Sequence, residues 1–548
     1  MISRRKIASL AALILLTAGL HAAANAPWRS SLYPENAPPG YTDSAGRFLH
    51  DFSFAGYHSG EAALPERTGP VTDVTQPPYR ADATGRADST TAIQAALDTV
   101  GQSGGGIVYL PPGHYRISPQ GDASFALKLR DDRVILRGAG ADRTFLFNTA
   151  VKMRGKQVIS VEPRARAWWN TGSGDPQGIA LSADLPGPSA VIPLTDVTPF
   201  AVGELIAVRN SLTQSYIDRL GMTGKWQPEN PANRPLAYAR RILAIDTARK
   251  TLTVDIPVRG FLYVTDRARV VKTTGRMLSE VGLEDFSMGM LQHPGKTLAD
   301  DAYDQPGTAA YDVHGSIALS LSFVENAWVR RVRTYAPEGN ASRVHILSNA
   351  LRLWNTRLVT VVGCDFKFPQ YRGGGGNGYL YCLNAQDNLL RDCRAEGGRH
   401  NFDFGTMASS GNVLLDCTAT DGDLASDFHM YLSLANLIDN LTCAGDYIEA
   451  RALRPWGGPI HGVTTTQSVF WNTNGLRYAA KHLGPAPALV YSHQFGDGYV
   501  IGTRGPAHEV DSDDFVEGVG RGDSLSPRSL YLDQLSRRLA RPTTPTAP

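Results

Sequence analysis

A short motif recurs in the C-terminal half of this 548-residue chain, and its period limits the possible fold. The segment NLLRDCRAEG begins at Asn388, and NVLLDCTATDG begins at Asn412. Their cysteines, Cys393 and Cys417, are 24 residues apart, and Cys443 follows at a similar interval. Each copy is a short apolar run ended by Gly, Asn or Asp, which is typical of a strand. A period of this length, carried by strands, predicts an all-β solenoid whose repeats stack on one another, and we expect a parallel β-helix.

Two aspartates hold equivalent places in this repeat. Asp403 and Asp427 each lie ten residues after a motif cysteine, and each precedes a phenylalanine, Phe404 or Phe428. Adjacent strands are about 4.8 Å apart, and side chains alternate between the two faces of a strand. If the two rings stack inside the coil, both carboxylates point outward in register. Because like charges at this spacing disfavour ionisation of both groups, the pair is expected to use a proton, a cation or a substrate.

Other polar residues are expected on the same outward strip or beside it. His429 and Tyr431 share the parity of Asp427, whereas His400 points inward unless it lies in a turn before its strand. A solvated outer face is the alternative interpretation of such a strip. The candidates for catalysis are Asp403, Asp427, His429, Arg399 and Arg451, and those for substrate binding are Tyr379, Tyr431, Glu449, Arg372 and His400.

The N-terminal half contains a segment that suits the end of a solenoid. Between Tyr79 and Ser118, Ser89 can cap a helix with an apolar face, three glycines end that helix, and the strand IVYLP follows. Such a helix would cover the open first coil. This segment resembles the N-terminal part of the pectate-lyase-like, right-handed parallel β-helix superfamily, and with the downstream coils the resemblance covers most of residues 76–510.

That resemblance implies a polysaccharide bound along one sheet face, with carboxylates, arginine or lysine, and histidine doing the chemistry at its centre. The superfamily includes polysaccharide lyases, glycoside hydrolases and phage depolymerases, so it indicates the fold better than the reaction. The paired-aspartate and GHG pattern of polygalacturonases is absent, and the arginine-based signature of pectate lyases is not evident.

The sequence also predicts how the chain is divided. The basic start MISRRK and the short apolar run after it are typical of a signal peptide, so we expect a secreted or periplasmic protein, exported by the Sec route or by the twin-arginine route. The expected parts are a signal peptide at 1–24, an N-terminal extension at 25–75, a parallel β-helix at 76–525 with a small β subdomain inserted at about 156–261, and a C-terminal helix with a disordered tail at 526–548.

Charge and cysteine content restrict the possible partners. Lys and Arg number 54 and Asp and Glu number 52, so no basic field for nucleic acid is present. We expect no membrane contact by the mature chain. All five cysteines lie between Cys364 and Cys443 in apolar contexts, so we expect most of them to be small core residues, with one disulfide as an alternative. The oligomeric state is not predicted.

The leading hypothesis for function is an exported lyase that cleaves a uronic-acid-containing polysaccharide by β-elimination. His429 would be the base, and Tyr379 or Tyr431 the acid. Arg399 or Arg451 would neutralise the substrate carboxylate.

The two aspartates leave alternatives open. Asp403 and Asp427 would orient the histidine or hold Ca²⁺; otherwise no cofactor is expected. A glycoside hydrolase or transglycosidase would instead use them as its paired carboxylates. A non-catalytic carbohydrate-binding surface protein is the third alternative.

Overall fold

The computed structural model describes residues 27–66, 69–169, 176–228, 235–407, 409–454, 461–482 and 486–541. The predicted signal peptide and the terminal PTTPTAP lie outside these ranges. Within them, no helix combines the length and the apolar character needed to cross a membrane.

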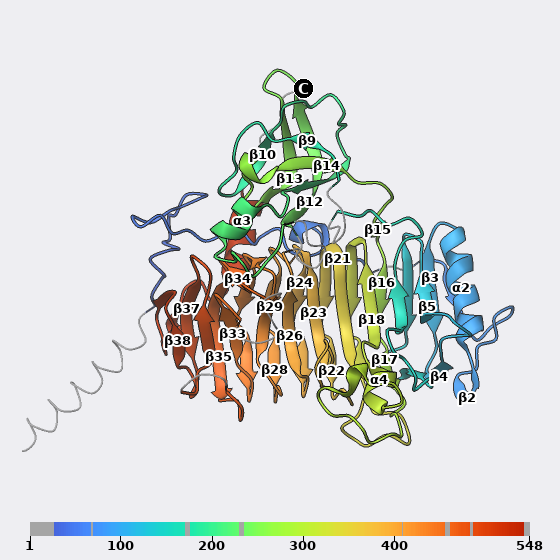
Figure 1. The fold of residues 1–548 in the computed structure, drawn as a ribbon. Helices are drawn as coiled ribbons and strands as arrows, with labels where there is room; N and C mark the ends of the chain where they lie inside the picture. Colours follow the sequence, from blue (N-terminus) through green and yellow to red (C-terminus); the bar gives the residue numbers. More distant parts are fainter. Residues whose placement is uncertain are drawn as a thin grey trace, which may run out of the picture.

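The described chain forms a parallel β-helix, as the repeat predicts (Figure 1). Each coil contributes to three faces, which we call sheets A, B and C, and every strand pairs in parallel with the equivalent strand of the next coil. The long strands β21 (Asn349–Val362) and β35 (Val469–Arg477) each turn a corner and belong to two faces.

Sheet A contains β1 (Val71–Asp73), β3 (Gly106–Leu110), β6 (Val134–Gly138), β16 (Gly282–Glu284), β19 (Val324–Arg330), β24 (Leu389–Arg391), β27 (Val413–Leu415), β31 (Leu437–Asp439), β37 (Tyr499–Arg504) and β39 (Phe515–Glu517). Sheet B contains β2 (Thr84–Asp88), β4 (Gly113–Ile117), β7 (Thr144–Asn148), β17 (Ser287–Met290), β20 (Arg333–Thr334), β22 (Asp365–Lys367), β25 (Arg394–Glu396), β28 (Thr418–Thr420) and β32 (Thr442–Ala444). Sheet C contains β5 (Phe125–Leu129), β8 (Gln157–Val161), β18 (Ile317–Ser322), β23 (Tyr379–Gln386), β26 (His400–Gly405), β29 (Ser426–Met430), β33 (Ile448–Arg451), β36 (Val490–His493) and β38 (Val510–Ser512).

The register expected from the repeat is confirmed. Asp403 pairs with Asp427, and Phe404 pairs with Phe428 across β26 and β29. The two phenylalanine rings stack inside the coil with centroids 4.9 Å apart and planes inclined by 17°. The five cysteines all lie among the described residues and all are free, so the alternative of a disulfide is not realised.

The asparagine of the repeated motif has a structural role of its own. Asn388 donates from its side-chain amide to Asn412 Oδ1 at 2.9 Å, and Asn412 donates in the same way to Asn436 Oδ1 at 2.9 Å. All three side chains are buried. A buried amide must find partners, and an identical amide one coil away supplies them, so this ladder fixes the spacing of consecutive coils.

Helix α2 (Thr90–Gln102) covers the first coil, as predicted. Its buried face is Ile93, Ala96, Leu97 and Val100. Ser89 is the N-cap residue by position, but its hydroxyl accepts the backbone N–H of Asp82 instead of capping the helix.

The inserted subdomain is a six-stranded antiparallel sheet that stands on one side of the β-helix (Figure 1). It runs from β9 (Ile179–Ala180) to β14 (Arg269–Lys272) through β10 (Ser189–Pro193), β11 (Leu205–Arg209), α3 (Gln214–Arg219), β12 (Ala237–Asp246) and β13 (Thr251–Val258). The insertion therefore begins later than residue 156, because β8 pairs in parallel with β5 and β18 as part of sheet C.

Buried ion pairs hold the insertion to the coils. Asp387, in the turn after β23, accepts Arg240 Nη1 at 3.1 Å and Arg259 Nη2 at 2.8 Å. All three side chains are excluded from solvent or nearly so. Buried charges are tolerated only when paired, and this triad links two inserted arginines to one aspartate of the β-helix.

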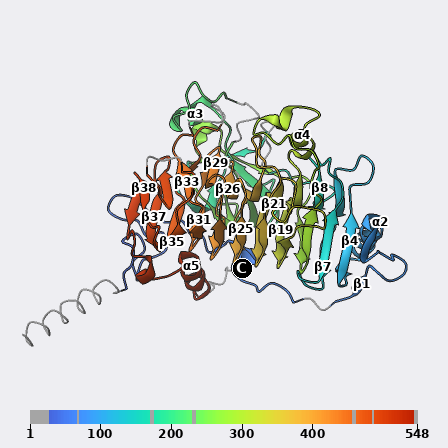
Figure 2. The same cartoon turned by 90° about the horizontal axis from the view of Figure 1, so that it is seen from below.

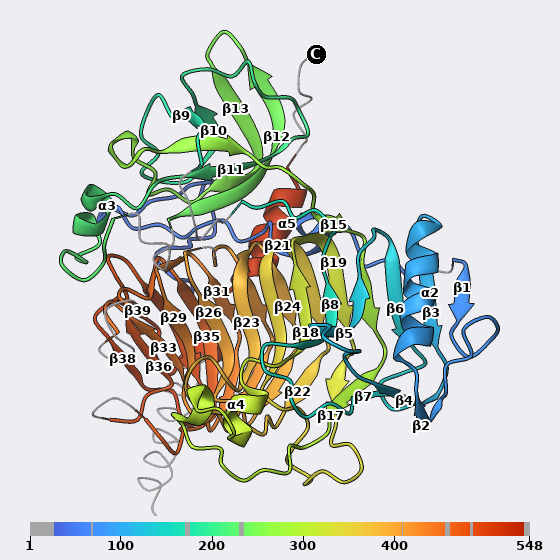
Figure 3. The same cartoon turned by 45° about the vertical axis from the view of Figure 1, so that its right-hand side comes forward.

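The two ends of the described chain cover sheet A. The extension donates from Gly56 N to the Asp387 carbonyl, and helix α5 (Leu530–Leu539) lies beside it at the base of the insertion (Figure 3). The N-cap of α5 is Ser529, whose hydroxyl accepts Leu532 N–H. Asp439 of β31 accepts from both the Ser529 hydroxyl and Tyr531 N–H, which binds the helix start to the coils.

Removing the Phe404 ring should destabilise the coils around the candidate site. Phe404→Ala leaves a cavity beside Phe428, and such a truncation costs about 3–5 kcal/mol of unfolding free energy. Phe404→Leu keeps most of the apolar volume and should cost clearly less. Chemical denaturation of both variants measures the difference; equal midpoints for the parent and Phe404→Ala would place this ring outside the core.

Candidate active site

An outward row of side chains in register crosses the middle of sheet C. The row consists of Arg352, Cys382, Asp403, Asp427, Glu449 and Tyr491, each paired with the next. The residues on either side of a member face the core: Leu351 and Leu353 flank Arg352, and Phe402 and Phe404 flank Asp403. The two aspartates thus lie on neighbouring rungs at the centre of an ordered series.

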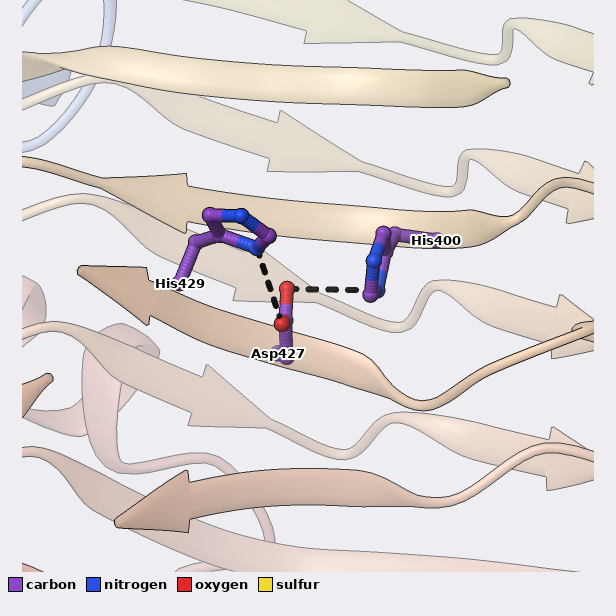
Figure 4. A group of neighbouring side chains, drawn as sticks. All are labelled: His400, Asp427 and His429. Carbon is purple, nitrogen blue, oxygen red and sulfur yellow. Dashed lines mark hydrogen bonds and ion pairs between the residues drawn. The ribbon is translucent and has the colours of Figure 1, made fainter. Parts of the chain in front are cut away.

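Asp427 is the hub of the charged cluster. Its Oδ2 lies 3.1 Å from His429 Nδ1 and 2.9 Å from Arg454 Nη1. Its Oδ1 lies 3.4 Å from His400 Nδ1. Figure 4 shows the carboxylate between the two imidazoles. The carboxylate is 1% exposed, so these contacts replace its hydration.

His400 reaches Asp427 because the strand alternation is broken at the start of β26. Asn401 donates its amide to buried Asp446, and Phe402 also lies in the core, so two consecutive residues face inward. His400 therefore shares the face of Asp427, contrary to its parity. Its Nδ1–H donates to the Ala425 carbonyl at 2.7 Å, and burial lowers its pKa to about 4.

The two aspartates divide one charge between them. Burial and the neighbouring charge of Asp427 raise the pKa of Asp403 well above its usual range. Burial also opposes ionisation of Asp427, but His400, His429 and Arg454 together outweigh it and lower its pKa. Neither Oδ1 atom has a conventional donor, and a proton on Asp403 that is shared with Asp427 satisfies both.

His429 is placed to act as a base. Burial lowers its pKa, with Asp427 opposing that shift, so the ring is neutral at neutral pH. With Nδ1–H donated to the ionised Asp427, the lone pair of Nε2 faces the Tyr379 hydroxyl at 3.3 Å. Burial and the two aspartates raise the pKa of Tyr379, so its proton stays on. The His429 side chain is 13% exposed and can meet a ligand above the sheet.

Several predicted residues lie at the edge of this cluster or outside it. Arg399, which we expected to neutralise the substrate carboxylate, instead pairs with Asp300 at 2.8 Å and donates to the carbonyl of exposed Arg372. The Arg399 side chain turns away from the cluster because Asp300, in the loop after β17, supplies the carboxylate that it binds. Arg451 pairs with Glu449 at 2.8 Å, one coil beyond Asp427.

Tyr431 also lies away from the strip. It has a positive φ of 57°, which ends the strand alternation after β29. Its ring packs 6.1 Å from Trp226 of the insertion, within the core that joins the insertion to the coils. Of the two tyrosines considered as acid, the structure therefore brings only Tyr379 to His429.

Arg454 is the main residue that the sequence pattern missed. Its Nη1 donates to Asp427 Oδ2 at 2.9 Å and to the His429 carbonyl at 2.8 Å, and it lies 2.8 Å from His429 Nδ1. His461 also approaches, with its ring centroid 5.3 Å from that of His429. Both lie beyond the strands, where the repeat has no register, so no periodic signal indicates them.

The arrangement does not fit Ca²⁺, which takes six to eight oxygen ligands. The atoms that converge are those of His400, Asp427 and His429, one carboxylate and two imidazoles. Arg454 Nη1 already donates to Asp427 Oδ2. The positive charge beside Asp427 thus comes from the chain itself.

Two inserted segments flank the cluster (Figure 2). On the side where β26 begins, Tyr371 donates to the Ala299 carbonyl in the loop that carries α4 (Ala309–Val313). On the side where β26 ends, Tyr216 of α3 contacts Met407. The loop that carries α4 and the insertion therefore lie beyond the two ends of the strands that carry the cluster.

Comparison with known proteins supports the fold class. Residues 77–174 match a family model described as rhamnogalacturonase A/epimerase, pectate lyase-like, which confirms the resemblance seen in the N-terminal segment. The coils themselves form the parallel β-helix that this resemblance implied.

Two curated relatives come from Azotobacter vinelandii. Mannuronan C5-epimerase AlgE6 is 47% identical over 62 residues, which is 11% of this chain and 7% of that protein. Alginate lyase 7 is 41% identical over 68 residues, which is 12% of this chain and 8% of that protein. The chain thus spans only about a tenth or less of the length of these relatives.

Two solved structures align with most of this chain at low identity. The tailspike gp61 of Pseudomonas phage phi297 is 12% identical, with a TM-score of 0.40, covering 80% of this chain and 70% of the tailspike. The A-module of AlgE6 from Azotobacter vinelandii is 13% identical, with a TM-score of 0.27, covering 81% of this chain and 98% of the module.

The shared proton of the aspartate pair can be measured. In the parent chain, Asp403 should titrate well above the ordinary range for aspartate, and Asp427 below it. Asp427→Asn removes the neighbouring negative charge and leaves Arg454 in place, so the pKa of Asp403 should fall. Carbon NMR of labelled aspartate carboxyls follows both groups. An Asp403 that titrates in the ordinary range in the parent would contradict the shared proton.

Proposed function

We propose that this chain is an exported lyase that cleaves a uronic-acid-containing polysaccharide by β-elimination. The observation that carries the proposal is the Tyr379–His429–Asp427 arrangement, in which a neutral imidazole lies between an ionised carboxylate and a protonated phenol. The named activities of the relatives, mannuronan C5-epimerase and alginate lyase, support a uronate polymer as the substrate. The expected signal peptide supports export.

The proposed reaction begins at the hydrogen on C5, next to the uronate carboxylate. His429 Nε2 removes this proton, and Asp427 stabilises the imidazolium through Nδ1–H. The C5–H electron pair forms the C4=C5 double bond as the C4–O4 bond breaks. The Tyr379 hydroxyl gives its proton to the leaving O4, and the phenolate regains a proton from the imidazolium. The products are an unsaturated uronate end and a new hydroxyl end, so all atoms balance.

The same cluster can stabilise the charge that develops on the substrate. Removing the C5 proton moves negative charge onto the uronate carboxylate, where fixed donors are most effective. The Arg454 guanidinium is the fixed positive charge beside His429. No step of this mechanism is assigned to a metal, because Arg454 supplies the positive charge at Asp427.

Epimerisation at C5 is a second candidate because it shares the first step. If Tyr379 returns a proton to the opposite face of C5, the configuration inverts and the chain is not cut. The similarity to mannuronan C5-epimerases favours this alternative. Product analysis distinguishes the two: a lyase forms unsaturated ends that absorb in the ultraviolet, whereas an epimerase introduces solvent deuterium at C5 of an intact polymer.

The hydrolase alternative agrees less well with the geometry. A retaining or inverting glycosidase needs one carboxyl group on each side of the scissile bond. Asp403 and Asp427 lie side by side on adjacent strands, both almost fully buried, and Asp427 is bound by Arg454 and His429. A non-catalytic binding protein would have no use for a neutral, solvent-accessible imidazole beside an ionised aspartate.

Substitutions in the cluster should separate these functions. His429→Ala, Tyr379→Phe and Asp427→Asn should each lower turnover of an acidic polysaccharide by about 10²-fold or more, since positioned proton transfer is worth roughly 10²–10⁴. His493→Ala is the matched control, because His493 lies on the same sheet and pairs with Asp511 and Asp513 outside the cluster. Its turnover should stay near that of the parent.

The readout is the ultraviolet absorbance of the unsaturated product together with deuterium incorporation at C5. If all three cluster variants keep near-parental turnover, the cluster is only a buried charge network. If both aspartate substitutions, Asp403→Asn and Asp427→Asn, abolish turnover while His429→Ala does not, the hydrolase alternative replaces the lyase.

A further inference from the structure

Unlike Arg399, Arg451 and Arg454, Arg352 has no acidic partner among the described residues. Arg399 pairs with Asp300, Arg451 with Glu449 and Arg454 with Asp427. Among the described residues, no carboxylate or hydrogen-bond acceptor binds the Arg352 guanidinium; its contact is with the face of Trp354, 4.2 Å from the ring centroid.

The position of Arg352 makes this lack of a partner costly. The side chain is half-buried on β21, and burial lowers its pKa. Its neighbours in the outward row are Ser320 on one side and Cys382 on the other. Burial raises the pKa of the Cys382 thiol, so that neighbour stays uncharged. A half-buried cation without a counter-charge destabilises a fold, unless a ligand brings the missing anion.

Register places this cation in line with the chemistry. Arg352 pairs with Cys382, Cys382 with Asp403, and Asp403 with Asp427. Two rungs separate Arg352 from Asp403, which corresponds to about 10 Å at the usual strand spacing. A sugar bound at His429 and a second anionic group at Arg352 can therefore belong to one oligomer lying across the rungs.

Trp354 explains how the guanidinium is held without an acid. It is two residues further along β21, on the same face, and the guanidinium lies over its ring. A cation over an indole face is attracted by the ring, while the N–H groups at the edge of the guanidinium stay available. Such a planar fork suits a carboxylate, which accepts two parallel hydrogen bonds.

We propose that Arg352, held by Trp354, is a binding subsite for the carboxylate of a uronate residue distant from the one that reacts. This inference rests on the proposed function and extends it: the substrate must be an oligomer that is acidic at two positions. Arg352 is thus a specificity residue, which touches the substrate but not the reacting atoms. Trp354 is a positioning residue that acts through it.

Binding to a catalytically silent chain tests the subsite without requiring turnover. The parent background is His429→Ala, and the probes are alginate oligomers long enough to span the rungs and the same oligomers with their carboxyl groups reduced to alcohols. Arg352→Gln should weaken binding of the acidic oligomer by about tenfold or more, because it removes a charge-assisted pair. Binding of the reduced oligomer should not change.

A matched control shows whether a loss of affinity comes from the position of Arg352 or only from the loss of one positive charge. Arg394→Gln removes the same charge from an exposed arginine of β25 on sheet B, a different face, and should leave affinity unchanged. Arg352→Lys should recover only part of the affinity, because an ammonium lacks the fork. Trp354→Leu should weaken acidic binding while leaving binding of the reduced oligomer unchanged.

The outcomes separate this inference from the proposed function. Equal affinity of Arg352→Gln and its background for the acidic oligomer, or equal losses with Arg394→Gln, overturns the subsite. If binding depends on Arg352 but the chain with His429 intact yields neither unsaturated product nor deuterium exchange, the subsite stands and the proposed chemistry fails. In the active chain, Arg352→Gln should raise KM for the polymer and leave kcat within about twofold, as expected for a contact made equally in ground and transition states.

Discussion

The parallel pairing of β26 with β29 is the interaction on which the candidate site depends. It stacks Phe404 on Phe428 inside the coil and thereby places Asp403 beside Asp427 outside it. A slip of one residue would exchange the two faces, exposing both rings and burying both carboxylates in the core. The apolar contact that stabilises the coil is thus also the contact that positions the acids.

Once the acids are adjacent and buried, electrostatics determines their protonation. Two ionised carboxylates in this environment would repel each other, so one keeps a proton and the other stays ionised. Asp427 takes that second role because His429 and Arg454 approach its Oδ2. The ionised Asp427 in turn determines the tautomer of His429. Because Asp427 accepts the Nδ1 proton, the lone pair of Nε2 can receive a proton. A pair of identical residues therefore yields two different functions.

The sequence predicts the parts of this site that share the repeat. Asp403 and Asp427 are found by counting from the motif, because stacked coils convert sequence intervals into register. Residues at strand ends escape that rule. His400 faces the cluster because Asn401 bonds to Asp446 and interrupts the alternation, and Tyr431 leaves the strip at a positive φ. Arg454 and His461 lie outside the strands, where only the folded chain brings them near.

The central claim is that His429 removes the C5 proton of a uronate, and a kinetic isotope effect tests it most directly. Turnover of an acidic polysaccharide deuterated at C5 should be slower than that of the unlabelled polymer, because the C5–H bond breaks in the reaction. Both elimination and epimerisation require this effect, and hydrolysis of the glycosidic bond does not. Equal rates on the two substrates, under conditions where the chemical step limits turnover, would contradict the account.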